Sequence, residues 1–549
     1  LYCTQKASSV PLNTHRKIFL VLGRCINTQE SFQGLFGFGK CSVIANLGVA
    51  ESYIYGNKYV GGVVGESAMG GSVTNCYNAG SVTGNEYVGG VVGWKYGTVT
   101  DCYNAGSVTG NEYVGGVIGF NGYSNSIVTD CYNTGKVNGN RSVGGMIGFN
   151  CSSITDCYNT GSVTGNERIG GVVGTNYGMV TDCYNTNIIT GNKCVGGVVG
   201  YGWRDDSTVA DCYNTGSVTG EEYVGGVVGS GSSSDITGCY NIGIVNGSKY
   251  VGGVVGSGSG DSDITGCYNI GIVNGSKYVG GVVGENYGTV ADCYNTSSVT
   301  GKDYVGVVVG DNFCGDVTNC YSTGRVTGNK YIGGVVGWTG MTRNWFGEDY
   351  DEYASITNCY NAGNVTGKSL YVGGVVGDNY VGGYVANCYN TGRVNGSGVV
   401  GFNHYETVNC YYYVGSCVDS DLSGTLSGTA LTNEQMLRAE CFEGFDFETV
   451  WTMDGNPGYP YPKLVNNFQT AAPYMVIHNS GIKGGTYTAD KIEVFFGEPG
   501  TTVSALPIEI PGYTFDETVE GTCMSGVVAE DGSLELALFY NGDGMEQLP

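Results

Sequence analysis

The sequence is poor in histidine, in basic side chains and in proline. Its 549 residues include 3 histidines, 9 prolines, and 24 lysines and arginines against 49 aspartates and glutamates, for a net charge of −25. A zinc peptidase of the common helical type needs two histidines one helical turn apart and a glutamate base. His15, His404 and His478 are too widely separated for that motif. The acidic balance leaves no basic stripe for phosphate groups, which disfavours nucleic acid and anionic membrane surfaces as partners.

Long apolar runs and closely spaced cysteine pairs are also missing. The longest apolar run near the beginning, Ile18–Leu22, is far shorter than the ~20 residues that cross a bilayer, so we expect no membrane insertion. The 22 cysteines include no Cys-x-x-Cys pair. The chain starts at Leu1 without a signal-peptide pattern, and we interpret it as a fragment of a longer protein. Its acidity is typical of a soluble extracellular protein.

Glycine and tyrosine are abundant instead, with 99 and 43 residues. Cys-Tyr pairs recur along the chain, and most neighbouring pairs are 26 to 29 residues apart. Their cysteines are Cys76, Cys102, Cys131, Cys157, Cys183, Cys212, Cys239, Cys267, Cys293, Cys320, Cys359, Cys388 and Cys410. A typical unit, residues 98–119, has three β-prone stretches separated by Asn-x-Gly and Gly-Asn turns, with no helical periodicity.

This repeat predicts the fold. A coil of three short strands cannot bury its apolar face alone, so the coils must stack and equivalent strands must pair in parallel. We therefore predict an all-β protein, a parallel β-solenoid with about three short strands in each coil of 26 to 29 residues. Thirteen coils at a spacing of ~4.8 Å would give a rod about 60 Å long. The period is too short for the blades of a propeller, which need roughly 40 residues.

Several columns of the repeat have predicted structural roles. The asparagines that follow the Cys-Tyr pairs, such as Asn78 and Asn104, are expected to form a side-chain amide ladder. Val73 and Cys76 are an odd number of positions apart, so burying both requires a corner or bulge between them. The paired glycines indicate positive φ or close backbone approach. We interpret the repeat cysteines as buried thiols, with some disulfides, or metal or redox chemistry, as alternatives.

A family resemblance supports this interpretation. The segments Val60–Gly65 and Val88–Gly93 both read Val-Gly-Gly-Val-Val-Gly, and such segments alternate with Cys-Tyr-Asn-x-Gly segments. This alternation resembles the GLUG repeats of bacterial surface proteins, over roughly residues 32–413. The resemblance implies an adhesin-like protein located outside the cell, on the bacterial surface.

We divide the chain into four parts. They are an atypical N-terminal segment at 1–30, a GLUG-type solenoid at 31–413, a cap and linker at 414–470, and a small β-rich module at 471–549. In the third part, residues 431–440 predict a short helix with Thr432 as N-cap and Gln435 completing a capping box. The last part, through Gly512–Phe515 and Gly532–Tyr540, resembles β-grasp-like, mucin-binding-type repeats of cell-wall proteins.

A column of acidic residues precedes the repeat cysteines. Its members are Asp101, Asp130, Asp156, Asp182 and Asp211. Carboxylates at one coil position repel each other unless they face water or bind cations. Calcium would suit them because it takes several oxygen ligands, but the Gly-Gly-x-Gly-x-Asp calcium repeat is absent. We favour a solvated acidic face and keep calcium as the weaker interpretation.

The variable loops after each Val-Val-Gly carry aromatic residues that stacking would align along one side of the rod. Flat aromatic rings suit sugars or peptides, and long loops on a rigid repeat are frequent binding sites. The simpler alternative is that these side chains only pack over turns. The predicted binding residues are Trp94, Phe120, Phe149, Trp203, Trp338, Trp345, Phe346, Tyr350 and Tyr353.

We therefore expect a non-catalytic surface protein, an adhesin or a structural stalk, with a glycan or a host-surface protein as partner. We expect neither a catalytic residue nor a cofactor. One alternative is a polysaccharide-processing solenoid enzyme, which would use paired carboxylates in a groove. Another is a non-catalytic fragment of a larger surface metallopeptidase, since related repeats occur in such proteins.

Overall fold

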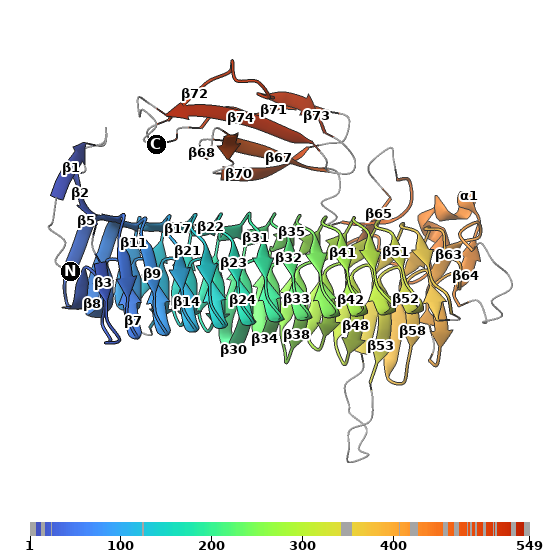
Figure 1. Cartoon of the computed structure of the whole chain (residues 1–549). Coiled ribbons are helices and arrows are strands. Elements are labelled where there is room, and N and C mark those ends of the chain that lie inside the picture. The colour runs from blue at the N-terminus through green and yellow to red at the C-terminus, as the bar shows by residue number, and fades with distance from the viewer. Residues whose placement is uncertain are drawn as a thin grey trace, which may run out of the picture. The chain divides into compact units, whose positions relative to one another are not determined.

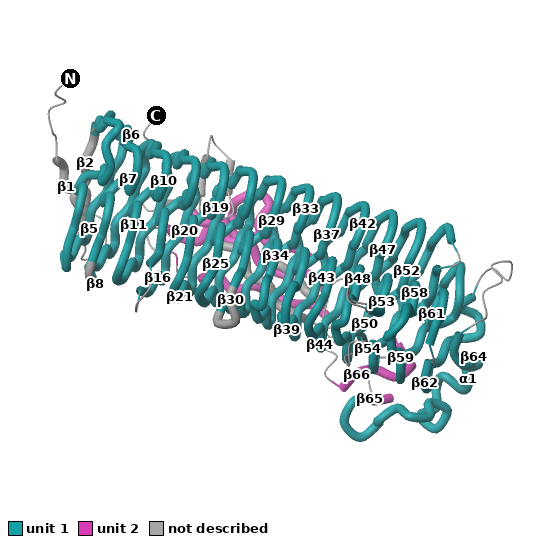
Figure 2. Tube along the Cα trace, turned by 90° about the horizontal axis from the view of Figure 1, so that it is seen from below, with its two compact units in different colours: residues 1–10, 18–451 teal, residues 11–17, 452–549 magenta. Residues whose placement is uncertain are grey.

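A computed structural model describes most of the chain. The described residues are 7–11, 17–23, 25–122, 126–341, 354–369, 371–405, 407–417, 427–453, 459–465, 472–479, 481–483, 486–488, 491–497, 501–508, 510, 513–528 and 534–542. The chain forms two compact units, one from residues 1–10 and 18–451 and the other from residues 11–17 and 452–549 (Figure 2). No helix among these described residues is long and apolar enough to cross a membrane.

The first unit is a parallel β-solenoid of about 13 turns, which confirms the predicted fold class (Figure 1). One coil shows its construction. It contains five short strands, where the sequence pattern suggested about three: β12 (Tyr103–Asn104), β13 (Val108–Thr109), β14 (Glu112–Gly115), β15 (Ile118–Asn121) and β16 (Ile127–Thr129). Each pairs in parallel with its equivalents in the neighbouring coils, as Val114 does with Val88 and Val143.

The stacked strands form three sheets, of 39, 13 and 12 strands, called sheets 1, 2 and 3 here. Sheet 2 contains β13 together with β3 (Cys25–Asn27), β6 (Tyr53–Tyr55), β9 (Ser81–Thr83), β18 (Val137–Asn138), β23 (Val163–Thr164), β28 (Ile189–Thr190), β32 (Val218–Thr219), β36 (Val245–Asn246), β41 (Val273–Asn274), β46 (Val299–Thr300), β51 (Val326–Thr327) and β56 (Val365–Thr366). Sheet 3 contains β14 together with β7 (Lys58–Gly61), β10 (Glu86–Gly89), β19 (Arg141–Gly144), β24 (Glu167–Gly170), β29 (Lys193–Gly196), β33 (Glu222–Gly225), β37 (Lys249–Gly252), β42 (Lys277–Gly280), β47 (Asp303–Gly306), β52 (Lys330–Gly333) and β57 (Val372–Gly373).

Sheet 1 includes the strands that begin in the Val-Val-Gly segments. These are β15 together with β4 (Phe36–Lys40), β8 (Val64–Asn78), β11 (Val92–Thr100), β20 (Ile147–Asn150), β25 (Val173–Asn176), β30 (Val199–Ala210), β34 (Val228–Thr237), β38 (Val255–Ser259), β43 (Val283–Asn286), β48 (Val309–Phe313), β53 (Val336–Gly340), β58 (Val376–Asn379) and β61 (Val400–Asn403).

The interior of the coils is filled by columns of valine, isoleucine and cysteine. Val73 and Cys76 are both fully buried, and the predicted corner lies between them at Asn75, whose φ is 52°. The paired glycines are required because the backbones of neighbouring coils lie very close together there. A Cβ at Gly62 would overlap the carbonyl oxygen of Gly90 in the next coil. The thirteen repeat cysteines are buried free thiols, in line with the favoured interpretation. Burial raises the pKa of thiols such as Cys131 and Cys239 well above the usual value.

The predicted amide ladder is present and runs along most of the solenoid. Asn159 Nδ2 donates to Asn185 Oδ1 at 2.7 Å and to the Gly161 carbonyl at 2.7 Å. Its Oδ1 accepts from Asn133 Nδ2 at 2.8 Å and from the Gly161 amide at 3.2 Å. Each such asparagine therefore forms hydrogen bonds with the backbone of the turn that follows it and with the equivalent asparagines of the two neighbouring coils.

A second amide ladder, in sheet 1, was not predicted. Asn121 donates to Asn150 at 2.6 Å, and Asn150 donates to Asn176 at 2.7 Å. In the coil before Asn121, the same position is occupied by Lys95, which is fully buried. Its Nζ donates to the Ile127 carbonyl at 2.9 Å, and burial lowers its pKa to about 7.

Both ends of the solenoid carry additional strands. At the beginning, β2 (Lys17–Leu22) pairs with β5 (Val43–Ala50), so the regular stack starts before the first recognisable repeat. At the other end, β64 (Thr429–Leu431) pairs with β63 (Tyr411–Tyr413). These extra strands pair with backbone groups that an open solenoid end would leave unpaired.

The C-terminal cap of this unit is helical and aromatic. The predicted helix is present as α1 (Asn433–Met436), with the Thr432 capping box, and η1 (Ala439–Cys441) follows it. Phe445 stacks on the fully buried Trp451 at 4.6 Å between ring centroids.

The second unit contains a four-stranded sheet in the order β70-β67-β74-β72. Its strands are β67 (Ala472–Asn479), β70 (Lys491–Gly497), β72 (Tyr513–Phe515) and β74 (Glu535–Gly542). The central pair, β67 and β74, is parallel, and the outer strands are antiparallel to them. Val476, Leu536, Leu538 and Tyr540 form its small core.

The amide ladder predicts a specific stability loss. Replacing Asn159 with alanine leaves buried amide groups of Asn133, Gly161 and Asn185 without their partners. The free energy of unfolding should fall by about 2–3 kcal/mol, as measured by urea melts followed by circular dichroism. The exposed Asn111→Ala is the matched control and should change it by less than about 0.5 kcal/mol. Equal effects of the two substitutions would contradict a stabilising ladder.

Candidate binding edge

Where sheet 3 meets sheet 1, three columns of side chains run along one edge of the solenoid, called the ladder edge here. The charged column contains Lys58, Glu86, Glu112, Arg141, Glu167, Lys193, Glu222, Lys249, Lys277, Asp303 and Lys330. The tyrosine column, one residue further on, contains Tyr59, Tyr87, Tyr113, Ser142, Arg168, Cys194, Tyr223, Tyr250, Tyr278, Tyr304 and Tyr331. The third column contains Glu66, Trp94, Phe120, Phe149, Thr175, Tyr201, Ser230, Ser257, Glu285, Asp311, Trp338, Asp378 and Phe402.

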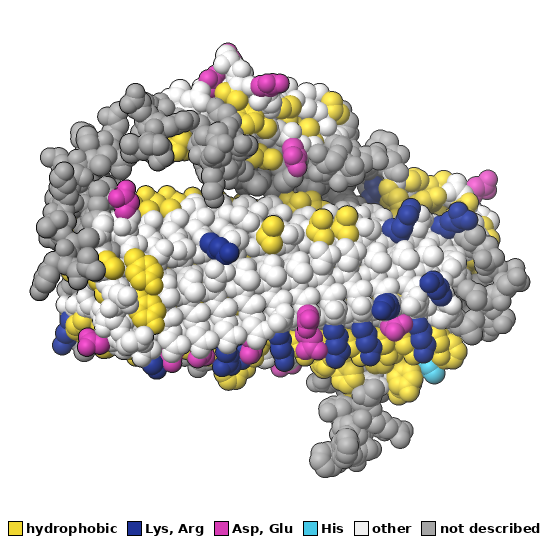
Figure 3. All heavy atoms as spheres, viewed as in Figure 1, with side chains coloured by type: hydrophobic (Ala, Val, Ile, Leu, Met, Phe, Trp, Pro, Cys, Tyr) yellow, Lys and Arg dark blue, Asp and Glu magenta, His cyan; other side chains and the backbone are white. Residues whose placement is uncertain are grey.

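Backbone packing brings the second and third columns together. A Cβ at Gly119, the residue before Phe120, would lie only 2.5 Å from the carbonyl carbon of Tyr87. A glycine at the end of each Val-Val-Gly segment therefore allows sheet 3 to pack directly against the beginning of the next strand of sheet 1. In Figure 3, charged and apolar side chains line the lower margin of the solenoid, over the strands labelled β33 to β58 in Figure 1.

The tyrosine column has a strained backbone and stacked rings. Its tyrosines have φ between 55° and 61°, a region that costs an L-residue roughly 1–2 kcal/mol. Tyr59, Tyr87 and Tyr113 stack with centroids 5.1 and 5.0 Å apart. Each stacked pair contributes about 0.5–1.5 kcal/mol, which offsets part of that strain. Stacking along the rod also covers the ring faces, so most tyrosines of this column present ring edges and hydroxyl groups.

Three of the predicted binding residues come together in the third column. Trp94 stacks on Phe120 at 4.1 Å and Phe120 on Phe149 at 5.1 Å. Tyr87 meets the Trp94 ring edge-to-face at 4.7 Å. Trp94 is the first ring of the stack, because the residue at the same position in the preceding coil is Glu66, which has no ring. Among the described residues, the Trp94 face on the Glu66 side has no stacked ring.

The other predicted residues are placed differently. Trp203 is 49% exposed but lies two residues beyond the third column, where it meets Tyr177 edge-to-face at 5.3 Å. Trp338 does lie in the third column, but it is only 8% exposed. Trp345, Phe346, Tyr350 and Tyr353 lie outside the described residues, and their role in binding stays a prediction.

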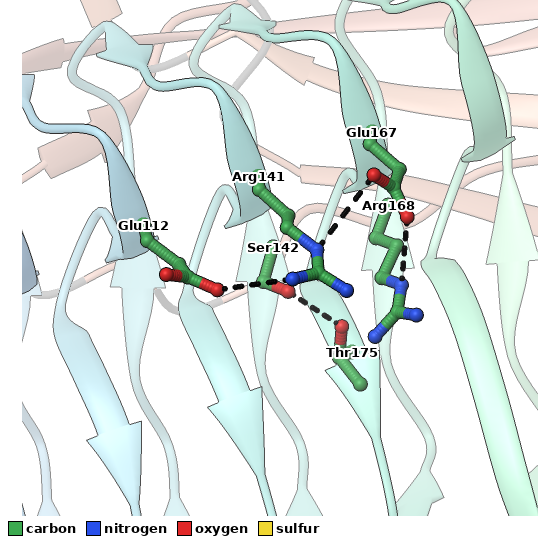
Figure 4. A network of polar contacts seen from close by, with 6 residues as sticks. All are labelled: Glu112, Arg141, Ser142, Glu167, Arg168 and Thr175. Atoms are coloured by element: carbon green, nitrogen blue, oxygen red, sulfur yellow. Dashed lines mark hydrogen bonds and ion pairs between the residues drawn. The ribbon is translucent and has the colours of Figure 1, made fainter.

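Ser142, Arg168 and Cys194 interrupt the tyrosine column near its middle. Figure 4 shows Ser142 and Arg168 with their polar contacts. Ser142 and Thr175 share a hydrogen bond of 2.8 Å between their hydroxyl groups. Arg141 lies between Glu112 and Glu167, at 3.4 and 3.7 Å. Arg168 reaches Glu167 at 3.3 Å and covers the ring of Tyr201 at 4.5 Å. Most charges in this stretch are therefore paired within the protein.

Toward the C-terminal end, the third column carries carboxyl groups that the sequence analysis missed. Glu285, Asp311 and Asp378 are 9%, 7% and 3% exposed. Burial raises the pKa of Glu285 and that of Asp311 above the usual range, and raises that of Asp378 to about 7. Oδ1 of Asp311 and Oδ1 of Asp378 have no hydrogen-bond partner among the described residues. These carboxyl groups vary from coil to coil, so no repeat pattern marks them.

The comparison with known families supports the repeat assignment. The GLUG motif matches the chain at residues 110–138, 165–190, 191–219 and 275–300. The chain carries GLUG repeats. No curated protein and no solved structure matches it.

Within the GLUG repeats, the acidic column has a backbone explanation. Asp101, Asp130, Asp156, Asp182 and Asp211 are exposed and have φ between 51° and 53°. Asparagine or glycine stands at this position in other coils, as at Asn75, Asn319 and Gly238. Asp, Asn and Gly are the residues that best tolerate this conformation. Burial, and then the charges of Asp156 and Asp211, raise the pKa of Asp182.

The described residues contain no group of three or more histidine, cysteine, aspartate or glutamate side chains that could hold a metal ion.

The backbone explanation can be tested at Asp182. Asp182→Asn should leave the melting temperature nearly unchanged, whereas Asp182→Ala should cost about 1 kcal/mol because of its positive φ. The calcium interpretation makes the opposite prediction. Added calcium would raise the melting temperature of the wild type, and Asp182→Asn would reduce that gain.

Proposed function

We propose that this chain is part of a non-catalytic bacterial cell-surface protein, an adhesin or a stalk, and that its ladder edge binds glycan or protein ligands outside the cell. The GLUG repeats and the solenoid support a repeat surface protein. Stacked coils fix every column residue at a regular spacing, so a ligand meets side chains that are already ordered. In this proposal the second unit is a cell-wall module of the β-grasp-like, mucin-binding type.

One observation carries the binding proposal: Trp94 ends an aromatic stack beside a carboxyl group. Trp94 is half-buried, and its face on the Glu66 side, on which no described ring stacks, can take the apolar face of a sugar ring. The neighbouring Glu66 can accept hydrogen bonds from sugar hydroxyl groups. Burial raises the pKa of Glu66, so this carboxyl is partly desolvated and suited to direct hydrogen bonding.

The runner-up, a polysaccharide-processing enzyme, is favoured by one feature of the structure. Glu285 and Asp311 stand in register in neighbouring coils, and both have raised pKa values. Glycoside hydrolysis commonly uses two carboxyl groups, one of them protonated. Release of reducing sugar from a polysaccharide by the wild type, lost in Asp311→Asn, would favour this activity over simple binding.

The binding proposal is tested by screening the intact chain on a glycan array and measuring the affinity of any glycan found. Trp94→Ala should weaken binding about tenfold, and Glu66→Gln should weaken it by a smaller factor. The matched control is Tyr184→Ala. Tyr184 follows the repeat cysteine Cys183, away from the three columns, and its half-buried ring stacks between those of Tyr158 and Tyr213. Melting curves establish that all three variants are folded. Unchanged affinity in Trp94→Ala would exclude this end of the ladder edge as the site.

A further inference from the structure

The charged column changes character along the rod. In its first part, neighbouring charges form ion pairs. Lys58 lies 2.7 Å from Glu86, and Arg141 lies between Glu112 and Glu167. From Lys249 onward the order is Lys249, Lys277, Asp303 and Lys330. Lys249 and Lys277 stand opposite each other in paired strands, an arrangement that is normally destabilising for like charges. Among the described residues, none of these lysines has an ion-pair partner within 4.0 Å.

Tyrosine rings hold the three ammonium groups in place. Lys249 lies 4.4 Å from the ring centroid of Tyr250, and Lys277 lies 4.4 Å from that of Tyr278. Lys330 lies between two rings, at 4.3 Å from Tyr331 and 4.7 Å from Tyr371. The hydrogen bond of Lys249 with Tyr250 raises its pKa, and that with Tyr331 raises the pKa of Lys330. Both lysines therefore keep their positive charge.

The buried carboxyl groups beside this row do not neutralise it at low pH. Asp311 faces Glu285 and Lys277, while Asp378 faces Lys330 and His404, whose Nε2 lies 4.0 Å from Asp378 Oδ1. Burial raises the pKa of Asp378 to about 7, so this group is largely protonated at about pH 6, and burial also raises the pKa of Glu285 and that of Asp311. Asp303 is then the one anion of the charged column between Lys249 and Lys330, and this stretch is locally positive in a chain of net charge −25.

We propose that the stretch from Lys249 to Lys330 binds a linear acidic polysaccharide, with its carboxylate or sulfate groups on the lysine row. This inference rests on the proposed function of the ladder edge and adds the class of ligand. An extended polymer lying along the rod meets one side-chain position every ~4.8 Å. Tyrosine ring edges and hydroxyl groups between the lysines provide hydrogen bonds for sugar hydroxyls. The strongly acidic remainder of the protein repels a denser polyanion such as DNA.

The test measures binding of the intact chain to chondroitin sulfate and hyaluronan, with uncharged dextran and double-stranded DNA as comparison probes. Replacing Lys249, Lys277 and Lys330 together with glutamine should weaken binding of the acidic polysaccharides at least about tenfold. The matched control replaces Lys136, Arg325 and Arg393, three exposed basic residues at the coil position before the strands of sheet 2, with glutamine and should bind like the wild type. Raising the salt from about 50 mM to about 500 mM should weaken wild-type binding.

Ionisation of Asp378 adds a second readout. As the pH rises through about 7, its new negative charge offsets Lys330, so wild-type binding should weaken. Asp378→Asn cannot ionise and should retain at about pH 8 most of the affinity that the wild type has at about pH 6.

Several results would overturn the inference. They are an unchanged affinity of the triple lysine variant, tighter binding of DNA than of either acidic polysaccharide, and no binding of chondroitin sulfate or hyaluronan by the wild type. Glycan binding that is lost in Trp94→Ala but kept in the triple lysine variant would overturn only this inference and leave the proposed function standing.

Discussion

In-register stacking of the coils is the constraint on which the rest of this structure depends. Each short strand of the solenoid finds its hydrogen-bond partners in the neighbouring coils. The amide ladder through Asn133, Asn159 and Asn185 adds a side-chain connection at the same spacing. Glycines such as Gly62 and Gly119 allow the walls to approach closely enough for this pairing. A residue's surroundings are therefore determined mainly by its position within the coil.

Stacking also creates the surface on which the functional proposals rest. Because equivalent residues repeat along the rod, one edge carries a charged column, a tyrosine column and a variable third column. The first two make a regular framework, with tyrosine rings stacked at about the coil spacing. Differences between coils then produce local chemistry, such as the end of the Trp94 stack beside Glu66, or the lysine row from Lys249 to Lys330. A uniform scaffold can thus carry distinct binding segments.

The sequence was sufficient to predict the solenoid, the amide ladder and the corner between Val73 and Cys76, because these features follow from periodicity and side-chain alternation. The ladder edge was harder to predict. Its columns meet because the backbone turns through positive φ at residues such as Tyr87, a conformation that residue type does not reveal. Stacking also covers the ring faces of Phe120, which the sequence suggested were open to ligands. Buried groups such as Lys95 and Asp311 were missed because they depart from the repeat.

The claim that position in the coil governs the whole structure is tested most directly by removing one coil. Deleting Tyr132–Cys157 joins Cys131 to Tyr158 and removes one repeat of 26 residues, the offset between Asn133 and Asn159. Deleting only Tyr132–Gly144 removes half a coil and puts every later column out of register. Thermal melts followed by circular dichroism should show the full-coil deletion melting within about 5 °C of the wild type, and the half-coil deletion strongly destabilised. Equal destabilisation by the two deletions would contradict the account.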